Sequence, residues 1–245
     1  MAGPDRSARQ DRKERRCGSL LLLCAALLIA LPVGVSHAQS RQRLLSGAIR
    51  ASAGNCPSSW TCGDVGHPAK PGSQSAHNGT FSITSESQDI YGASDQFHYV
   101  WKKTPVDTQL TARIVSQGAS DGTAKAGLML RTGTSASAPH YATLEEPTGN
   151  VRKQGAVFVQ WRAPGGAFAY DQTYVASGAP IYLELTRQGT SFSALTSRDG
   201  KTWKLVPGSM MTLAVKGALW GGFAVTSHST TTASTAVFDH IHVSG

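Results

Sequence analysis

The feature that most constrains the fold is a succession of short β-rich runs from Cys56 to the C-terminus, each bounded by Gly, Pro, Ser, Asn or Asp. No convincing helical period interrupts them. About a dozen strands with turn residues between them predict an all-β fold, either a sandwich or a barrel. The predicted strands span residues 80–85, 96–103, 108–117, 124–132, 140–145, 156–162, 181–188, 191–197, 202–206, 219–227 and 234–243.

Turn signals and composition agree with this prediction. Asn78-Gly79, Asp121-Gly122 and Asp199-Gly200 are hairpin dipeptides, because Gly adopts a positive φ without strain. Charged residues make up 16% of the chain, which argues against a coiled coil or a helical bundle, since both expose many charged side chains. A hydrophobic share of 40% argues against a disordered polyelectrolyte.

The N-terminal segment has the order of a secretory signal. Basic residues crowd positions 6–16, an unbroken apolar run spans 20–31, and small residues precede a cleavage position after Ala38. This predicts a signal peptide over residues 1–38 and a secreted or periplasmic protein. The alternative is an uncleaved anchor, but the run is shorter than the roughly 20 residues that span a bilayer. We therefore expect no stable membrane span after cleavage.

Removing the signal changes how the rest of the chain is interpreted. Residues 39–55 are polar and are expected to form a flexible leader, and residues 56–245 form the predicted domain. Part of the formal charge of +8 leaves with the signal, and no Lys/Arg cluster remains, so a nucleic-acid partner is not predicted. Cys56 and Cys62 are the two cysteines left, and export favours a disulfide between them over half of a metal site.

Side-chain alternation divides the predicted strands into two faces. One face is apolar, with residues such as Leu110, Leu128, Val159 and Leu183. If the strands share a sheet, the opposite face collects a second set: Arg113, Arg131, Tyr141, Phe158, Gln160, Arg162, Tyr182 and Glu184. Aromatic platforms beside rigid polar groups are what a sugar needs, so these eight residues are the predicted carbohydrate site. The alternative is that the charged residues merely solvate the sheet or pair with each other.

Six stretches resemble a known group of sandwich domains. They are residues 64–103 with DIYGASDQFHY, KAGLMLR (125–131), YLELTRQG (182–189), SRDGKTW (197–203), GFAVTSH (222–228) and AVFDHIHV (236–243). Their order resembles exported bacterial, non-catalytic domains of the concanavalin A-like lectin/glucanase superfamily, which are related to the yeast enolase-regulation protein and to sandwich domains of β-xylosidases. The likeness covers nearly all of residues 60–245. It implies an antiparallel two-sheet jelly roll that binds carbohydrate or serves as an extracellular interaction module.

Catalysis is not expected from the carboxylates. Glycoside hydrolysis needs two of them facing one bond, and the E-x-D-x-x-E strand of the superfamily's glucanases is absent here. Glu145 and Glu146 are adjacent, so they point to opposite faces of a strand, and Glu184 stands apart. A hydrolase or lyase is the least favoured alternative.

Metal binding is left open, and no cofactor is predicted. His240 and His242 alternate to one strand face, but no third ligand lies near them in the sequence. A structural calcium could use scattered oxygen ligands, and the candidates are Asp64, Asp89, Asp95 and Asp239. Turn capping is the preferred role for Asp89 and Asp95. The Asp199-Gly200 hairpin, with Trp203 packed beneath it, is expected to be structural.

The sequence therefore predicts an exported, concanavalin A-like β-sandwich that binds a poly- or oligosaccharide without cleaving it. Part of this prediction rests on fold analogy. The principal alternative is an extracellular protein-interaction or structural module without a sugar site.

Overall fold

The computed structural model of the chain describes residues 54–147, 155–166, 170–171, 175–176 and 178–245. Every described residue belongs to one compact unit. The predicted signal peptide and nearly all of the predicted leader lie outside the described residues. Among the described residues, no helix is long and apolar enough to cross a membrane.

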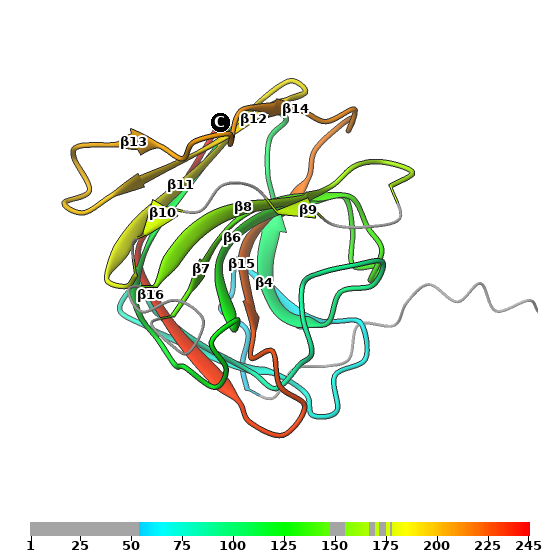
Figure 1. Cartoon of the computed structure of the whole chain (residues 1–245), viewed down its shortest axis with the longest axis vertical. Helices are drawn as coiled ribbons and strands as arrows, with labels where there is room; N and C mark the ends of the chain where they lie inside the picture. Colours follow the sequence, from blue (N-terminus) through cyan, green and yellow to red (C-terminus); the bar gives the residue numbers. More distant parts are fainter. Residues whose placement is uncertain (1–53, 148–154, 167–169, 172–174, 177) are drawn as a thin grey trace, which may run out of the picture. The chain divides into compact units, whose positions relative to one another are not determined.

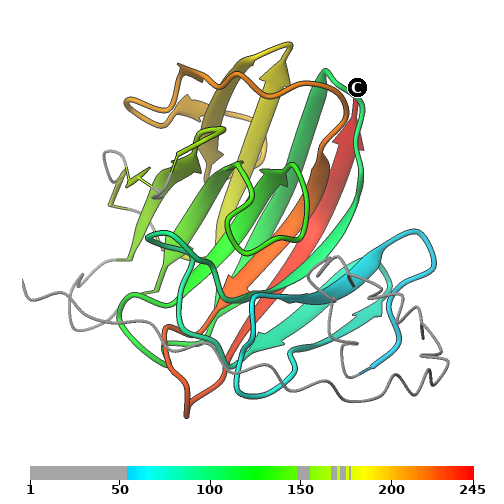
Figure 2. The same ribbon diagram turned by 90° about the vertical axis from the view of Figure 1, so that its right-hand side faces the viewer.

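Two antiparallel sheets of eight strands form the domain (Figure 1; Figure 2). Sheet A has the order β1 (Thr61–Val65), β4 (Phe97–Lys103), β15 (Trp220–Thr226), β6 (Lys125–Arg131), β7 (His140–Glu146), β8 (Ala156–Arg162) and β10 (Val175–Ala176), and β9 (Tyr170–Asp171) also pairs with β8. Sheet B has the order β13 (Lys204–Leu205), β12 (Ser191–Ser197), β11 (Ile181–Gln188), β5 (Thr108–Gln117), β16 (Ser234–Ser244), β3 (Thr80–Ser85) and β2 (Ser73–His77), and β14 (Met211–Thr212) pairs with β12. The predicted two-sheet antiparallel sandwich is confirmed.

All eleven predicted strands are present, five of them with the predicted bounds. Five further strands were not predicted: β1, β2, β9, β10 and β14. β2 has the sequence SQSAH, which lacks apolar alternation, and β9, β10 and β14 have two residues each. Pairing with a longer neighbour forms these strands, so their own side chains carry little signal.

The main core lies between the sheets. Leu110 of β5 and Leu183 of β11 face Leu128 of β6 and Val159 of β8, and all four are fully buried. The predicted apolar face is therefore correct for these strands. It is inverted on β7, where Tyr141 points into this core and Ala142 points away from it. The reason is that both faces of β7 are buried, so alternation alone does not indicate which face meets the other sheet.

Two local predictions are confirmed. Cys56 and Cys62 form a disulfide that leads into β1. Asp199 caps the hairpin after β12 by accepting the backbone N–H groups of Lys201 and Thr202 at 2.8 and 2.7 Å. Gly200 has φ +69°, and a Cβ there would lie 3.0 Å from the Tyr182 ring, so glycine is needed both for the turn and for the close approach.

Candidate functional site

Sheet A has a second apolar face, turned away from sheet B, which we call the distal face. It carries a cluster separate from the main core: Val65, Ile90, Phe97, Tyr99, Trp101, Met129, Ala142, Leu144, Phe158 and Ala224. Along β4, the rings of Phe97, Tyr99 and Trp101 follow one another at 5.5 and 5.1 Å between centroids. Trp220 of β15 continues the row at 5.7 Å from Trp101. Aromatic packing of this kind makes the distal face a rigid support.

The segment Glu86–Gln96, which joins β3 of sheet B to β4 of sheet A, reaches this support. Its Ile90 side chain is fully buried in the distal cluster. The N–H of Gln96 donates to the carbonyl oxygen of Asp89 at 2.7 Å and closes the segment on itself. Burial of Ile90 fixes the middle of the segment, since a buried Ile contributes about 2 kcal/mol.

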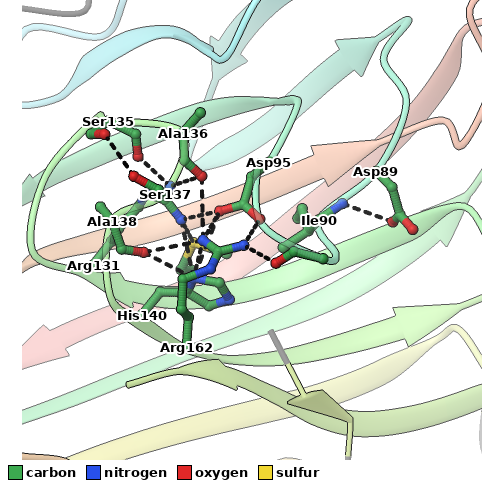
Figure 3. Close-up of polar contacts among 12 residues, drawn as sticks. Asp89, Ile90, Asp95, Arg131, Ser135, Ala136, Ser137, Ala138, His140 and Arg162 are labelled. Atoms are coloured by element: carbon green, nitrogen blue, oxygen red, sulfur yellow. Dashed lines mark hydrogen bonds and ion pairs between the residues drawn. The ribbon is translucent and has the colours of Figure 1, made fainter. Parts of the chain in front are cut away.

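Asp95 anchors the end of the same segment to two arginines. Its carboxylate accepts hydrogen bonds from both Arg131 and Arg162 (Figure 3), at 2.7 and 2.6 Å. The three side chains have no solvent exposure. Arg162 also donates to the carbonyl oxygen of Gly92 at 2.9 Å, and Arg131 to that of Ser135 at 2.6 Å. The arginines on β6 and β8 thus hold two loops on the sheet through charge-assisted hydrogen bonds.

Electrostatics in this cluster favours an ionised aspartate and a neutral histidine. Burial alone would raise the pKa of Asp95, but the hydrogen bond from Arg162 and the nearby cations lower it below its usual range. Burial lowers the pKa of His140 to about 3. A neutral His140 can accept a hydrogen bond from Arg131 at Nδ1, where the distance is 3.2 Å. One carboxylate therefore faces two guanidinium groups.

A surface pocket of about 550 Å³ lies along the Glu86–Gln96 segment and is lined in part by an exposed tyrosine. We call it the Tyr91 pocket. Its described lining residues are Gln88, Asp89, Tyr91, Ser94, His228, Ser229 and Thr230. Tyr91 is 55% exposed, although the adjacent Ile90 is fully buried. The Nζ of Lys125 lies 2.6 Å from Asp89 Oδ1 and 5.7 Å from the centre of the Tyr91 ring. The lysine thereby ties both residues to sheet A.

His228 connects three loops at the edge of the Tyr91 pocket. Its Nδ1 lies 3.1 Å from Asp121 Oδ1, and its Nε2 lies 3.6 Å from Asp89 Oδ2. It adopts φ +51°, a conformation that is uncommon outside glycine and brings its ring between the two carboxylates. Hydrogen bonds from Thr123 lower the pKa of Asp121. The pocket thus combines an exposed aromatic ring with carboxylate, amide, imidazole and hydroxyl groups.

The eight residues of the predicted sugar face do not form one surface, because their strands belong to different sheets. β5 and β11 pair in sheet B, whereas β6, β7 and β8 pair in sheet A. Sheet B carries Arg113, Tyr182 and Glu184, and the distal face carries Arg131, Phe158, Gln160 and Arg162. Tyr141 lies between the sheets, where its hydroxyl donates to the Ser209 carbonyl oxygen at 2.6 Å.

The eight residues therefore do not share one face. The four on the distal face are also completely buried. On sheet B, Arg113 forms an ion pair with Asp239 at 2.5 Å and lies 5.6 Å from the Tyr182 ring. Glu184 Oε2 is 3.5 Å from the Thr111 hydroxyl. The arginines of the predicted site are engaged in ion pairs that organise each sheet separately.

The structure also separates the candidate metal ligands. Each of the four aspartates has its own partner: His98 for Asp64, Lys125 for Asp89, the two arginines for Asp95, and Arg113 for Asp239. A bulge between Asp239 and His242 interrupts the alternation assumed for His240 and His242. In the described part of the chain, no three His, Cys, Asp or Glu side chains gather as potential metal ligands.

Sequence reasoning missed Tyr91 because it sought the site on strands. The signal was present in the segment DIYG, where an aromatic residue stands two positions after an aspartate and directly before a glycine, outside any predicted strand. Such a residue in a turn has no sheet neighbour to cover it, and loops on a rigid scaffold commonly carry binding residues.

Comparison with known proteins supports the fold. No protein-family model and no curated protein matches the sequence. A functionally unknown protein from Saccharomyces cerevisiae is similar, with a TM-score of 0.61 and 14% identity over 77% of this chain and 97% of that chain. The GH43 BlXynB protein from Bacillus licheniformis has a TM-score of 0.53 and 12% identity, over 76% of this chain and 36% of that chain. At these identities the likeness concerns the sandwich fold alone.

Proposed function

We propose that this domain binds carbohydrate at the Tyr91 pocket without cleaving it. The observation that carries the proposal is the Tyr91 ring, exposed in a polar pocket on a segment whose neighbouring residues are buried and anchored. An exposed aromatic ring can stack against the apolar C–H face of a sugar, and the surrounding polar groups can bond its hydroxyls.

The rigidity of the segment that carries Tyr91 supports the proposal. Ile90 and Asp95 fix the segment on either side of Gly92, and Lys125 holds Asp89 beside the ring. A ligand that stacks on Tyr91 would not need to order the segment first, so less binding free energy is spent on conformational entropy.

The charges of the pocket favour binding over hydrolysis. A general acid in glycoside hydrolysis needs a carboxyl group with a raised pKa. Asp121, which contacts His228 of the pocket, has a lowered pKa, and Asp89 is engaged by Lys125. Among the described carboxyl groups, Glu145 has a raised pKa, and it does not line this pocket.

We further propose that the protein acts outside the cytoplasm. The signal-like N-terminus motivates this proposal, and the Cys56–Cys62 disulfide supports it, since such bonds persist in oxidising compartments. Mass spectrometry of the protein recovered from the extracytoplasmic fraction tests both points, because a mature chain that begins at Gln39 is expected. An uncleaved chain in the cytoplasm would refute the proposal.

A glycan array probed with the exported protein, followed by calorimetry on the best ligand, tests carbohydrate binding. Tyr91→Ala should weaken binding about tenfold or more, which corresponds to the roughly 1.4 kcal/mol expected for one stacked ring. Tyr182→Ala, on sheet B, is the matched control and should leave the affinity unchanged. Binding to no glycan, or equal binding by both variants, would refute the site. Release of reducing sugar from the bound polysaccharide would refute the non-catalytic role.

A further inference from the structure

A bulge in β5 turns a polar side chain into the space between the sheets. Ile114 pairs with Phe238 of β16 and Ser116 pairs with Val237, so Val115 is an extra residue without a partner. Gln117 then pairs with Ala236, which belongs to the inter-sheet core. Because directly opposed residues point to the same face, Gln117 points inward as well. Bulges commonly re-aim a side chain in this way beside functional sites.

Glu145 of β7 faces the same space from sheet A. It shares the inward face of Tyr141 and is 1% exposed. The N–H of Ala179 donates to its Oε1 at 3.2 Å. Within the described part of the chain, its Oε2 has no hydrogen-bond partner, and neither does either amide atom of Gln117. Two buried polar groups from opposite sheets are thus left with unused hydrogen-bonding capacity, which is uncommon in folded proteins.

These two groups line a pocket of about 210 Å³. Val115, Pro147 and Ala179 contribute apolar surface to it. Ala119 also lines it and is exposed, so the pocket opens to solvent on that side. The pocket therefore has a partly apolar wall with a carboxyl group and an amide beneath it, and its volume suits a ligand with a body of a few carbon atoms.

We propose that this pocket binds a small primary ammonium group on a short aliphatic chain. An ammonium group has three N–H donors and no acceptor. Glu145 Oε2 and Gln117 Oε1 are the two unused acceptors, and the carboxylate adds the opposite charge. Both atoms have almost no accessible surface, so the two side chains turn toward the ligand when it binds. The aliphatic chain would contact Val115 and Pro147. The Tyr91 pocket shares none of these residues, so either proposal can fail without the other.

The ionisation of Glu145 suits such a ligand and provides a readout. Burial raises the pKa of Glu145 to about 7, against the opposing hydrogen bond from Ala179, and the neighbouring charge of Glu146 raises it further. Only the ionised form presents a carboxylate to the ammonium group. Affinity should therefore fall about tenfold between pH 8.5 and pH 6, as the ionised fraction falls.

Calorimetry and amide NMR on the full-length protein, with n-butylammonium chloride as the probe, test the proposal. We expect saturable binding at pH 8.5, a shift of the Ala179 amide signal, and binding of n-butanol at least tenfold weaker. Glu145→Gln preserves the shape, and should weaken butylammonium binding tenfold or more. The matched control Glu184→Gln should not change it.

A second variant keeps the proposal testable if Glu145→Gln impairs folding. Ala119→Leu fills the opening without altering a polar group, and should also abolish binding while the protein retains its thermal melting profile. Equal binding of n-butanol, undiminished binding by Glu145→Gln, or no saturable binding by the folded wild-type protein would each overturn the proposal.

Discussion

Asp95→Asn is the sharpest test of how the distal face is held together. The substitution keeps the shape of the side chain but removes the carboxylate that pairs with Arg131 and Arg162, and all three side chains are inaccessible to solvent. Breaking a buried ion pair by removing one partner typically costs about 3–5 kcal/mol, because the remaining charge stays buried without compensation. For a domain of this size, the melting temperature should fall by roughly 10 °C.

Asp239→Asn is the matched control. Asp239 also pairs with an arginine, but the side chains of Arg113 and Asp239 are 31% and 19% exposed. A partly exposed pair contributes about 0–1 kcal/mol, since water screens both charges. Urea unfolding followed by tryptophan fluorescence gives both free energies of unfolding. The explanation of the Asp95 cluster would be refuted if Asp95→Asn cost less than about 1 kcal/mol, or no more than Asp239→Asn.

A double-mutant cycle separates the Asp95–Arg162 interaction from the effects that each substitution has by itself on the free energy of unfolding. Arg162→Met removes a guanidinium that the Asp95 carboxylate holds at 2.6 Å. If the two side chains act on each other, Arg162→Met should destabilise the Asp95→Asn protein much less than it destabilises the wild-type protein. Additive losses would mean that the two residues stabilise the domain independently.

Three further predictions concern protonation and the disulfide. His140 is neutral in the fold because burial lowers its pKa to about 3, so urea titrations should show stability falling as pH drops from about 6.5 toward 3, and His140→Gln should flatten part of that slope. Glu145 has a pKa raised to about 7, so its contribution is lost as pH rises from about 4.5 to 7, and Glu145→Gln should gain stability relative to wild type over that range. Replacing Cys56 and Cys62 by serine should cost about 2 kcal/mol in the same assay, because the disulfide closes a short loop in the unfolded chain.

The alternation of apolar and polar residues predicted the orientation of a strand correctly where one face is buried and the other is not. On β5, the alternation of Leu110, Ala112 and Ile114 with polar neighbours predicted both the strand and its inward face. On β7, all seven residues are buried, so the alternation of Tyr141 and Ala142 was ambiguous and the predicted face was inverted. A strand covered on both sides has no polar face to orient it.

The candidate sites show a second limit. The eight residues of the predicted sugar face have the right parity within each strand, apart from β7, but parity does not specify which strands pair. Tyr91 and Asp89 come together with His228 only because Ile90 and Asp95 fix their segment on sheet A. Gln117 and Glu145 line one pocket only because a bulge at Val115 reverses the alternation of β5.

The amino-acid sequence by itself determined the all-β class, most of the strands, the Cys56–Cys62 pairing and the Asp199-Gly200 hairpin. These features depend on neighbours a few residues apart, and local periodicity and turn chemistry encode them. Only the tertiary structure decided which strands share a sheet, that Arg131 and Arg162 are buried around Asp95, and that Tyr91 is exposed. These features depend on contacts between residues far apart in the chain, where burial and charge compensation can be judged only once the sheets are packed together.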